Sequence, residues 1–330
     1  MSQDLVGDIL NSVVDEYVEK RANQLLKEGV PIENISEKIE SEINQAEGHS
    51  FAEPLIEQFS DDCVASIEKI MESELDSQYT EEKHFLDDNN KLWKKGFDMS
   101  MTMYGMVTEA AQKCRNYYCS LPGRDKDDLK YRFNVLYELT GRACQEFLEI
   151  LWLLKGGFAD AAYSRCRSIY EISVVSELIS TNDESVAKAY YEAAFTDDTE
   201  YNWARALPRY KDSKQQFIRF GELRKMCTVV TSGKWNNMYK KSCKTLHAAP
   251  QGTFARIGLP DSSNIISVGR SEYGIAVPAV NSAISLMFTM CFLASIIHNF
   301  DSKMHVRTIQ KWLSKLSDYY SDIEKTLLDQ

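Results

Sequence analysis

The chain has 330 residues, of which 44% are hydrophobic, so it can form one large or two ordinary domains with a proper core. Its formal net charge of -11 argues against general, sequence-independent binding of nucleic acids. The eight cysteines are scattered without a CxxC pair, which indicates neither a zinc site nor a disulfide framework, and we expect no metal and no cofactor.

The first ninety residues form an acidic region with 23 acidic and 6 basic residues, a net charge of -17. Apolar residues at helical spacing predict three helices there: residues 5–18, 30–43 with Asn34 or Ser36 as the cap, and 53–75. The polar residues 76–90 are expected to link this region to the main body, which gives domains 1–90 and 91–330. Acids at the very N-terminus, where a signal peptide carries positive charge, favour a cytoplasmic location.

The helical signals are longer from residue 92 onward. One helix is expected to end before Pro122, and the next, over 127–155, before the glycine pair at 156 and 157. The helix predicted from Ala159 to Ser180 then forms an antiparallel hairpin with its predecessor, because the connection is so short. Further helices are expected over 184–195, 199–206, 212–228 and 235–248, and two more after an irregular connection with room for one short strand. The predicted fold class is all-α, a helical-bundle body with an acidic N-terminal helical region.

Residues 275–297 carry no charge and are long enough to cross a membrane. Polar residues such as Asn281, Ser285 and Thr289 dilute the run, and no second such run exists. We therefore favour a buried central helix of the bundle and expect no membrane contact. A membrane-associated effector remains the weaker alternative.

A strongly basic segment covers residues 203–247, with eleven basic and two acidic residues and a net charge of +9. Aromatic residues alternate with these charges: Trp203, Tyr210, Phe217, Phe220, Trp235 and Tyr239. Such a segment suits RNA, because phosphates pair with cations and bases stack on rings. Alternatively, the aromatic residues are core and the basic face docks on the acidic N-terminal region. Both interpretations are compatible with an acidic segment that covers a basic site until a partner displaces it.

His247 is the histidine inside the basic segment. A helix there would place it on one face with Tyr239, and Lys240 and Lys244 would lie beside them. An imidazole among cations suits phosphate chemistry, because it moves a proton while the cations stabilise developing charge. The alternative is a histidine near a helix C-terminus that contacts free carbonyl groups.

Charges also interrupt the apolar pattern of the hairpin. Arg167 and Glu171 stand four residues apart, and Arg142 and Glu146 repeat that spacing on the preceding helix. Buried ions persist only when they are paired and hydrogen-bonded, which predicts intrahelical salt bridges with some bonding across the hairpin. Alternatively, one arginine faces a cleft and meets an anion. Arg165 has no acid four residues away and is expected to be the freer of the two.

The stretch LLKGGFADAAYSRCRSIYEISVVSELI has a helix that ends in glycine, an alanine-rich turn and the pattern R-S-[LIY]-[YH]-E. The residues that match are Gly156, Gly157, Ala159, Ala161, Ala162, Arg167, Ser168, Tyr170 and Glu171. This stretch resembles a bacterial family of unknown function, DUF5677, and the later YKKSCKTLH is similar to a second element of that family. The resemblance extends over about residues 92–300. It implies an all-helical body and no established activity.

A more distant likeness is to HEPN domains, helical bundles that often act as metal-independent ribonucleases in toxin and defence systems. Their signature is an arginine shortly before a histidine. Lys241 takes that place here, with five residues between it and His247. This likeness implies that His247 is the general acid/base and that Lys241 and Lys244 hold phosphate, with Arg167 either as a second anion contact or as a structural ion-pair partner.

The leading hypothesis is therefore an RNA-binding or RNA-cleaving protein of a bacterial defence or toxin-type system. The proposed binding residues are Lys240, Lys244, Tyr239, Arg165 and Glu171. The alternative is a non-catalytic helical protein that oligomerises or docks a protein partner, with charges that only orient the complex. A homo-oligomer is expected under either hypothesis.

Overall fold

The computed structural model describes residues 5–46, 52–197, 201–211, 213–215, 217–232 and 269–329, together with residues 239, 250, 253, 257 and 258. Within these residues every regular element is a helix and no strand occurs, which confirms the all-α fold class. The contacts divide the chain into two units, Met1–Phe85 and Leu86–Gln330.

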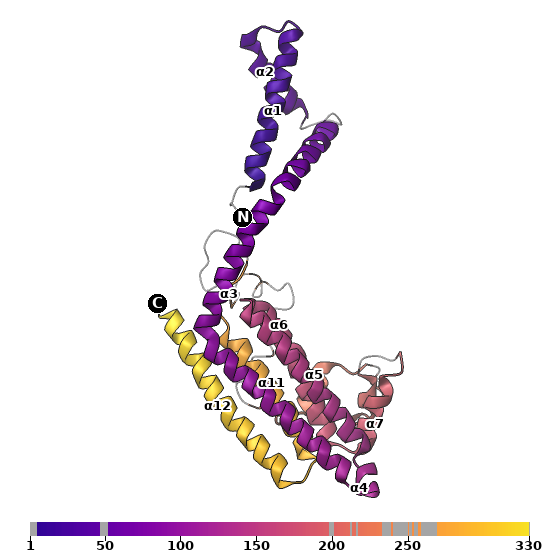
Figure 1. The fold of residues 1–330 in the computed structure, drawn as a ribbon. Helices are drawn as coiled ribbons and strands as arrows, with labels where there is room; N and C mark the ends of the chain where they lie inside the picture. The colour runs from indigo at the N-terminus through magenta and orange to yellow at the C-terminus, as the bar shows by residue number, and fades with distance from the viewer. Residues whose placement is uncertain are drawn as a thin grey trace. The chain divides into compact units, whose positions relative to one another are not determined.

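Figure 1 shows the helices, which follow in chain order as α1 (Leu5–Lys27), α2 (Ile32–Ala46), α3 (Ala52–Ser120), α4 (Gly123–Asp127), α5 (Lys130–Lys155), α6 (Ala159–Thr181), α7 (Glu184–Ala193), the 3-10 helices η1 (Asn202–Ala206) and η2 (Pro208–Tyr210), α8 (Phe220–Met226), α11 (Ala276–Ser295) and α12 (Phe300–Leu328).

Two of the expected boundaries near the N-terminus are wrong. Helix α2 begins at Ile32, before both Asn34 and Ser36, so neither residue is its cap. The polar stretch 76–90 is helical throughout and belongs to α3. No glycine or proline occurs between Pro54 and Gly96, and residues such as Glu, Lys and Leu are good helix formers, so nothing in the sequence ends the helix there.

Helices α1 and α2 form a hairpin in the first unit. Gly29 adopts a φ of 84° in the connection, a left-handed conformation that glycine adopts at little cost. Arg21 clamps the pair, because its Nε and Nη2 atoms donate to the two carboxylate oxygens of Glu42 at 2.9 and 2.8 Å. A small core lies between the helices, made of Leu25, Ile35 and Ile39.

The hairpin of α5 and α6 is confirmed as predicted. Helix α5 ends at Lys155 and α6 begins at Ala159. Gly157 turns the chain with a φ of 77°. The buried side chain of Asn89, from α3, donates to the backbone oxygens of Leu154 and Lys155 at 3.1 and 2.9 Å, so it satisfies carbonyl groups that the helix end leaves open.

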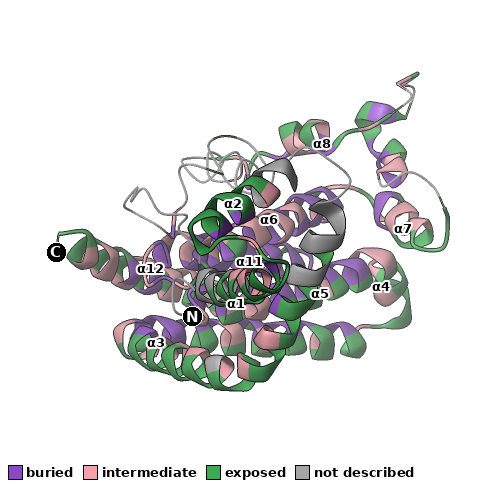
Figure 2. Ribbon diagram, turned by 90° about the horizontal axis from the view of Figure 1, so that it is seen from above, coloured by how far each residue is buried: buried purple, intermediate pink, exposed green. Residues whose placement is uncertain are grey.

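Helix α11 packs against α5, α6 and α12, and Figure 2 shows buried residues along it. Of the described helices, it is the one long and apolar enough to span a membrane, and 72% of its most apolar window is buried inside the fold. The expectation of a buried bundle helix is therefore confirmed. Most of its small residues, among them Ala279, Ser282 and Ala283, are buried, and they let neighbouring helices approach closely.

Helix α12 packs against the C-terminal part of α3. Tyr320 is fully buried, its ring stacks on Trp93 at 5.6 Å, and its hydroxyl bonds the Ser100 hydroxyl at 3.0 Å. Gly96 makes room for this ring, since a Cβ there would lie 2.8 Å from it. The indole of Trp312 donates to the backbone oxygen of Met99 at 3.0 Å.

The segment after α6 is less helical than expected. Helix α7 lies close to its predicted range, but 199–206 yields only the 3-10 helix η1, and 212–228 yields only the short helix α8. Most of the predicted helix 235–248 and of the connection that follows lies outside the described residues. The segment is nevertheless anchored to the bundle, because Trp203, Tyr210 and Phe220 are buried.

Candidate functional site

The R-S-x-Y-E stretch on α6 lies at the centre of a charge network with α5. Glu146 is a buried acid, and its Oε1 accepts from the Ser168 hydroxyl at 2.9 Å and from Arg142 Nε at 3.2 Å. The predicted pair of Arg142 and Glu146 is therefore present, although Arg142 itself is largely exposed. The other oxygen of Glu146, Oε2, is buried and has no hydrogen-bond partner among the described residues.

Arg165 is not the freer arginine that the sequence predicted. Its Nη2 lies 2.6 Å from Glu149 Oε2 and 3.7 Å from Glu146 Oε1, and both acids belong to the facing helix α5. Four-residue spacing along α6 cannot reveal this pairing, because it crosses the hairpin. Arg165 therefore ties the two helices together, and its guanidinium is already neutralised by acids.

Arg167 pairs with Glu171 as predicted, with Nε 2.8 Å from Oε1, and both side chains are about three-quarters buried. Tyr239 joins this pair from the basic segment. Its hydroxyl donates to Glu171 Oε1 at 3.4 Å, and its ring stacks on Tyr170 with 4.6 Å between centroids. Arg224 lies 5.0 Å from the Tyr239 ring centroid, within the range of a cation–π interaction.

Burial raises the pKa of Tyr170 to about 12, so this phenol stays neutral at physiological pH. The ion pair of Arg167 and Glu171 therefore lies beside the neutral phenol of Tyr170, and the guanidinium of Arg224 lies against the Tyr239 ring. Three of the eight predicted site residues, Arg167, Glu171 and Tyr239, contact one another here. Arg165, a fourth, is paired with Glu149 of α5 across the hairpin. The other four, Lys240, Lys241, Lys244 and His247, lie outside the described residues.

Ser168 and Glu171 also line an inner cavity of about 160 Å³, together with Arg142. Its walls are aromatic and aliphatic: Leu139, Ile172, Val175, Tyr190, Tyr201, Trp203 and Phe220. Tyr190 and Trp203 meet edge to face at 5.1 Å, and burial raises the pKa of Tyr190. The cavity combines a polar wall with aromatic rings, which is the composition of many ligand pockets.

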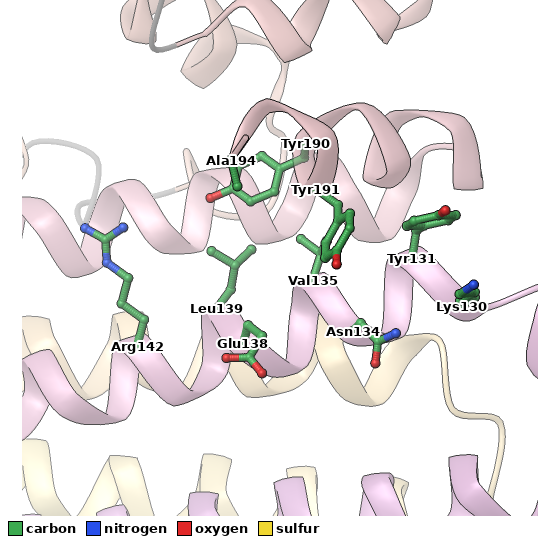
Figure 3. A pocket seen from close by; sticks show the side chains of 10 residues that line it. All are labelled: Lys130, Tyr131, Asn134, Val135, Glu138, Leu139, Arg142, Tyr190, Tyr191 and Ala194. Carbon is green, nitrogen blue, oxygen red and sulfur yellow. The ribbon is translucent and has the colours of Figure 1, made fainter. Parts of the chain in front are cut away.

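A larger groove of about 680 Å³ lies between α5 and α7, here called the α5–α7 groove (Figure 3). It shares Leu139, Arg142 and Tyr190 with the inner cavity. Its other lining residues are Lys130, Tyr131, Asn134, Val135, Glu138, Tyr191 and Ala194. Sequence reasoning missed this groove, because only packing brings α7 against α5.

The described part of the basic segment presents charge outward. Trp203, Tyr210 and Phe220 are buried, so the interpretation of these aromatic residues as core is correct. Phe217 is 59% exposed. The exposed cations of residues 209–225, here called the cationic surface, are Arg209, Lys211, Lys214, Arg219 and Lys225. None of these five forms a salt bridge with another residue in the described part of the chain.

Glu177 anchors the segment that carries this surface, and sequence reasoning missed it. Its buried carboxylate accepts the backbone N–H groups of Thr228, Val229 and Val230 at 2.6, 2.9 and 2.8 Å. Three N–H groups that converge on one carboxylate form a strong, charge-assisted anchor. The available signal was a single acid within the otherwise uncharged C-terminal part of α6, residues 172–181. Among the described residues, no group of three or more His, Cys, Asp or Glu side chains could hold a metal ion.

Residues 133–217 match the model of a family of unknown function, DUF5677. The resemblance seen in the sequence is confirmed over this range, which is narrower than expected and excludes the later YKKSCKTLH stretch. Searches among curated proteins and among solved structures gave no match. All residues of the inner cavity except Phe220 lie within the matched range.

Proposed function

We propose that this protein binds RNA through the cationic surface. The observation that supports this proposal is the presence of five exposed cations on one short segment, none of them in a salt bridge with a described acid, although Glu222 lies close enough to Arg209 and Arg219 for their charges to lower its pKa. The same segment carries the exposed Phe217. Like charges held together on one short segment repel one another, and an anionic partner relieves that repulsion. Phosphates would pair with the lysines and arginines, and a base can stack on Phe217.

The arginines of the hairpin take a different part in this proposal. Arg165 and Arg167 already form ion pairs with Glu149 and Glu171, so they position the scaffold and do not supply free positive charge. Tyr239 stands directly before Lys240 and Lys241 in the sequence and is held against Glu171. The contact of Tyr239 thus connects the basic segment with the R-S-x-Y-E stretch.

Affinity for a labelled single-stranded RNA, measured at several salt concentrations, tests the proposal. The logarithm of the association constant should fall linearly with the logarithm of salt concentration. Replacement of Lys211, Lys214 and Lys225 by alanine should lower the slope by about two, because each phosphate contact on a single strand contributes about 0.7. The matched control replaces three exposed lysines of α12: Lys311, Lys315 and Lys325. No binding at low salt, or an equal loss in the control, would contradict the proposal.

In the cleaving form of this function, His247 is the general acid/base and Lys241 holds phosphate. What supports this form is the HEPN likeness of the sequence, and a role in bacterial defence or a toxin-type system rests on the same likeness. His247→Ala should then abolish cleavage and leave binding intact, and chelators should have no effect. Cleavage that survives His247→Ala contradicts the assignment.

A non-catalytic interaction protein is the second candidate. It is favoured by the ion pairs of Arg165 and Arg167, which give both arginines a structural role. In this case the cationic surface docks an acidic protein face, such as that of the N-terminal unit or of a second copy. Light scattering of the purified chain would show a stable oligomer, and its mass would fall towards the monomer at high salt.

A further inference from the structure

The α5–α7 groove has the size of a small-molecule site. Its volume of about 680 Å³ lies within the range of roughly 300 to 1,000 Å³ that is common for ligand pockets. The buried side chains of Val135 and Leu139 form an apolar floor. Figure 3 shows Tyr190 and Tyr191 on α7 above this floor, with Tyr131 on α5 at one end.

A polar row runs along the same groove on α5. Lys130, Asn134, Glu138 and Arg142 follow at four-residue spacing, and all four are exposed. Residues four apart on a helix lie about 6 Å apart along its axis. Figure 3 shows Arg142 and Lys130 at opposite ends of the row. A ligand in the groove therefore meets a cation at each end, with an amide and a carboxylate between them.

The middle of the row is not used within the protein. A glutamate four residues before an arginine is the favoured order for an intrahelical ion pair, yet Arg142 bonds Glu146 and not Glu138. Among the described residues, the side chains of Glu138 and Asn134 have no hydrogen-bond partner. The terminal nitrogens of Arg142 likewise donate no hydrogen bond to a described residue, since only its Nε bonds Glu146. These groups are available to a ligand.

The rings beside the row can hold a planar ligand. Tyr131 and Tyr191 have centroids 5.7 Å apart at an interplanar angle of 56°, and Tyr191 is 48% exposed. Stacking of a base on such a ring contributes strongly to nucleotide binding. Lys130 and Lys188 lie 5.5 and 5.9 Å from the Tyr131 centroid, which adds positive charge near the open end.

We propose that the α5–α7 groove binds a guanine nucleotide, either free or as a residue of single-stranded RNA. The base stacks on Tyr191 or Tyr131, and the Glu138 carboxylate accepts its N1–H and N2–H groups. Guanine is the common RNA base that presents two adjacent N–H donors on one edge. The phosphate meets Arg142 or Lys130 at an end of the row. This site is separate from the cationic surface and does not rest on RNA binding there.

Calorimetric titration of the full chain with GMP, AMP, CMP, UMP and inorganic phosphate tests the site. GMP should bind most tightly. Glu138→Gln should weaken GMP binding roughly five- to 150-fold, the discrimination that a bidentate base contact typically provides, and should leave AMP binding unchanged. Tyr191→Ala should weaken all four nucleotides, whereas Tyr191→Phe should keep the stacking and the affinity. Glu109→Gln and Tyr79→Ala, at exposed positions on α3, are the matched controls.

Short RNA identifies the source of the nucleotide. If UGU binds at least tenfold more tightly than GMP and than UUU, the site holds a residue of RNA, and if UGU binds no better than GMP, it holds the free nucleotide. The proposal is overturned if GMP binds no better than AMP and phosphate, or if Glu138→Gln has no effect. The variant with alanine at 211, 214 and 225 separates the two proposals, because the salt dependence of its RNA binding should fall while its affinity for GMP stays unchanged.

Discussion

The hydroxyl of Tyr239 lies 3.4 Å from Oε1 of Glu171, the same oxygen that accepts the Nε hydrogen of Arg167 at 2.8 Å. One carboxylate oxygen thus joins a residue of the basic segment to an arginine one turn earlier on α6. The stacking of Tyr239 on Tyr170 adds an apolar contact to the polar one. The R-S-x-Y-E stretch therefore acts as a structural anchor for the segment after α8.

Glu171→Ala should lower the free energy of unfolding by about 1 to 2 kcal/mol. It removes a charge-assisted hydrogen bond from Arg167 and the partner of the Tyr239 hydroxyl. The cost stays below that of a fully buried pair because water still reaches both side chains. Urea unfolding checks this value, with Glu109→Ala, an exposed position on α3, as a control that should change stability by less than about 0.5 kcal/mol.

Glu146→Ala should cost more, about 2 to 3 kcal/mol. Glu146 is buried, so its removal leaves the Ser168 hydroxyl without its acceptor and opens a small cavity in the hairpin. Glu149 is the matched comparison, because it also binds Arg165 but is partly exposed, and Glu149→Ala should cost about 1 kcal/mol or less. Thermal unfolding of both variants gives the comparison, and equal losses would contradict the role assigned to Glu146.

The elements that the sequence predicts well are those with strong local signals. The glycine pair at 156 and 157 marks the hairpin turn, and the uncharged run that begins at residue 275 predicts the buried helix α11. The ion pairs at four-residue spacing were also predictable, since they lie on one helix. The pairing of Arg165 with Glu149 was not, because the two residues meet only once the hairpin closes.

The contacts of Glu177 show the same limit for the segment after α6. Its three N–H partners are 51 to 53 residues away, and no local pattern connects them. The α5–α7 groove depends on how α7 packs beside α5, so its lining residues could be recognised as exposed polar and aromatic residues but not as one site. Long-range packing, more than local propensity, thus determines the candidate sites.

Glu177→Ala should lower the free energy of unfolding by about 3 kcal/mol, because three backbone N–H groups lose their shared acceptor. Glu177→Gln should cost less, since its amide oxygen can still accept from some of them, although without the charge. Amide hydrogen exchange provides a local measurement. Residues 228–230 should exchange faster in both variants, and unchanged exchange at these residues would show that the anchor is not needed.

Two glycines of α3 should respond in opposite ways to alanine. Gly96→Ala should destabilise the bundle by about 1 to 2 kcal/mol, because its Cβ would lie 2.8 Å from the buried Tyr320 ring, which stacks on Trp93 and cannot move freely. Gly105 has open space at the same atom, so Gly105→Ala should stabilise the helix by up to about 1 kcal/mol through higher helix propensity. Thermal unfolding of the two single variants measures both signs.

The acidic N-terminal region should weaken RNA binding at the cationic surface. Replacement of Glu33, Glu37 and Glu40 of α2, all exposed, by glutamine removes part of the charge that competes with RNA. Affinity should rise several-fold at low salt, and the gain should shrink as salt increases, because screening shortens the range of the competing field to about 10 Å at 0.1 M.

The control for this variant neutralises three exposed acids of α12: Asp301, Asp318 and Asp322. If the α2 variant binds no better than the wild type at any salt concentration, the acidic region does not mask the surface, and an equal gain in the control would assign the effect to net charge alone.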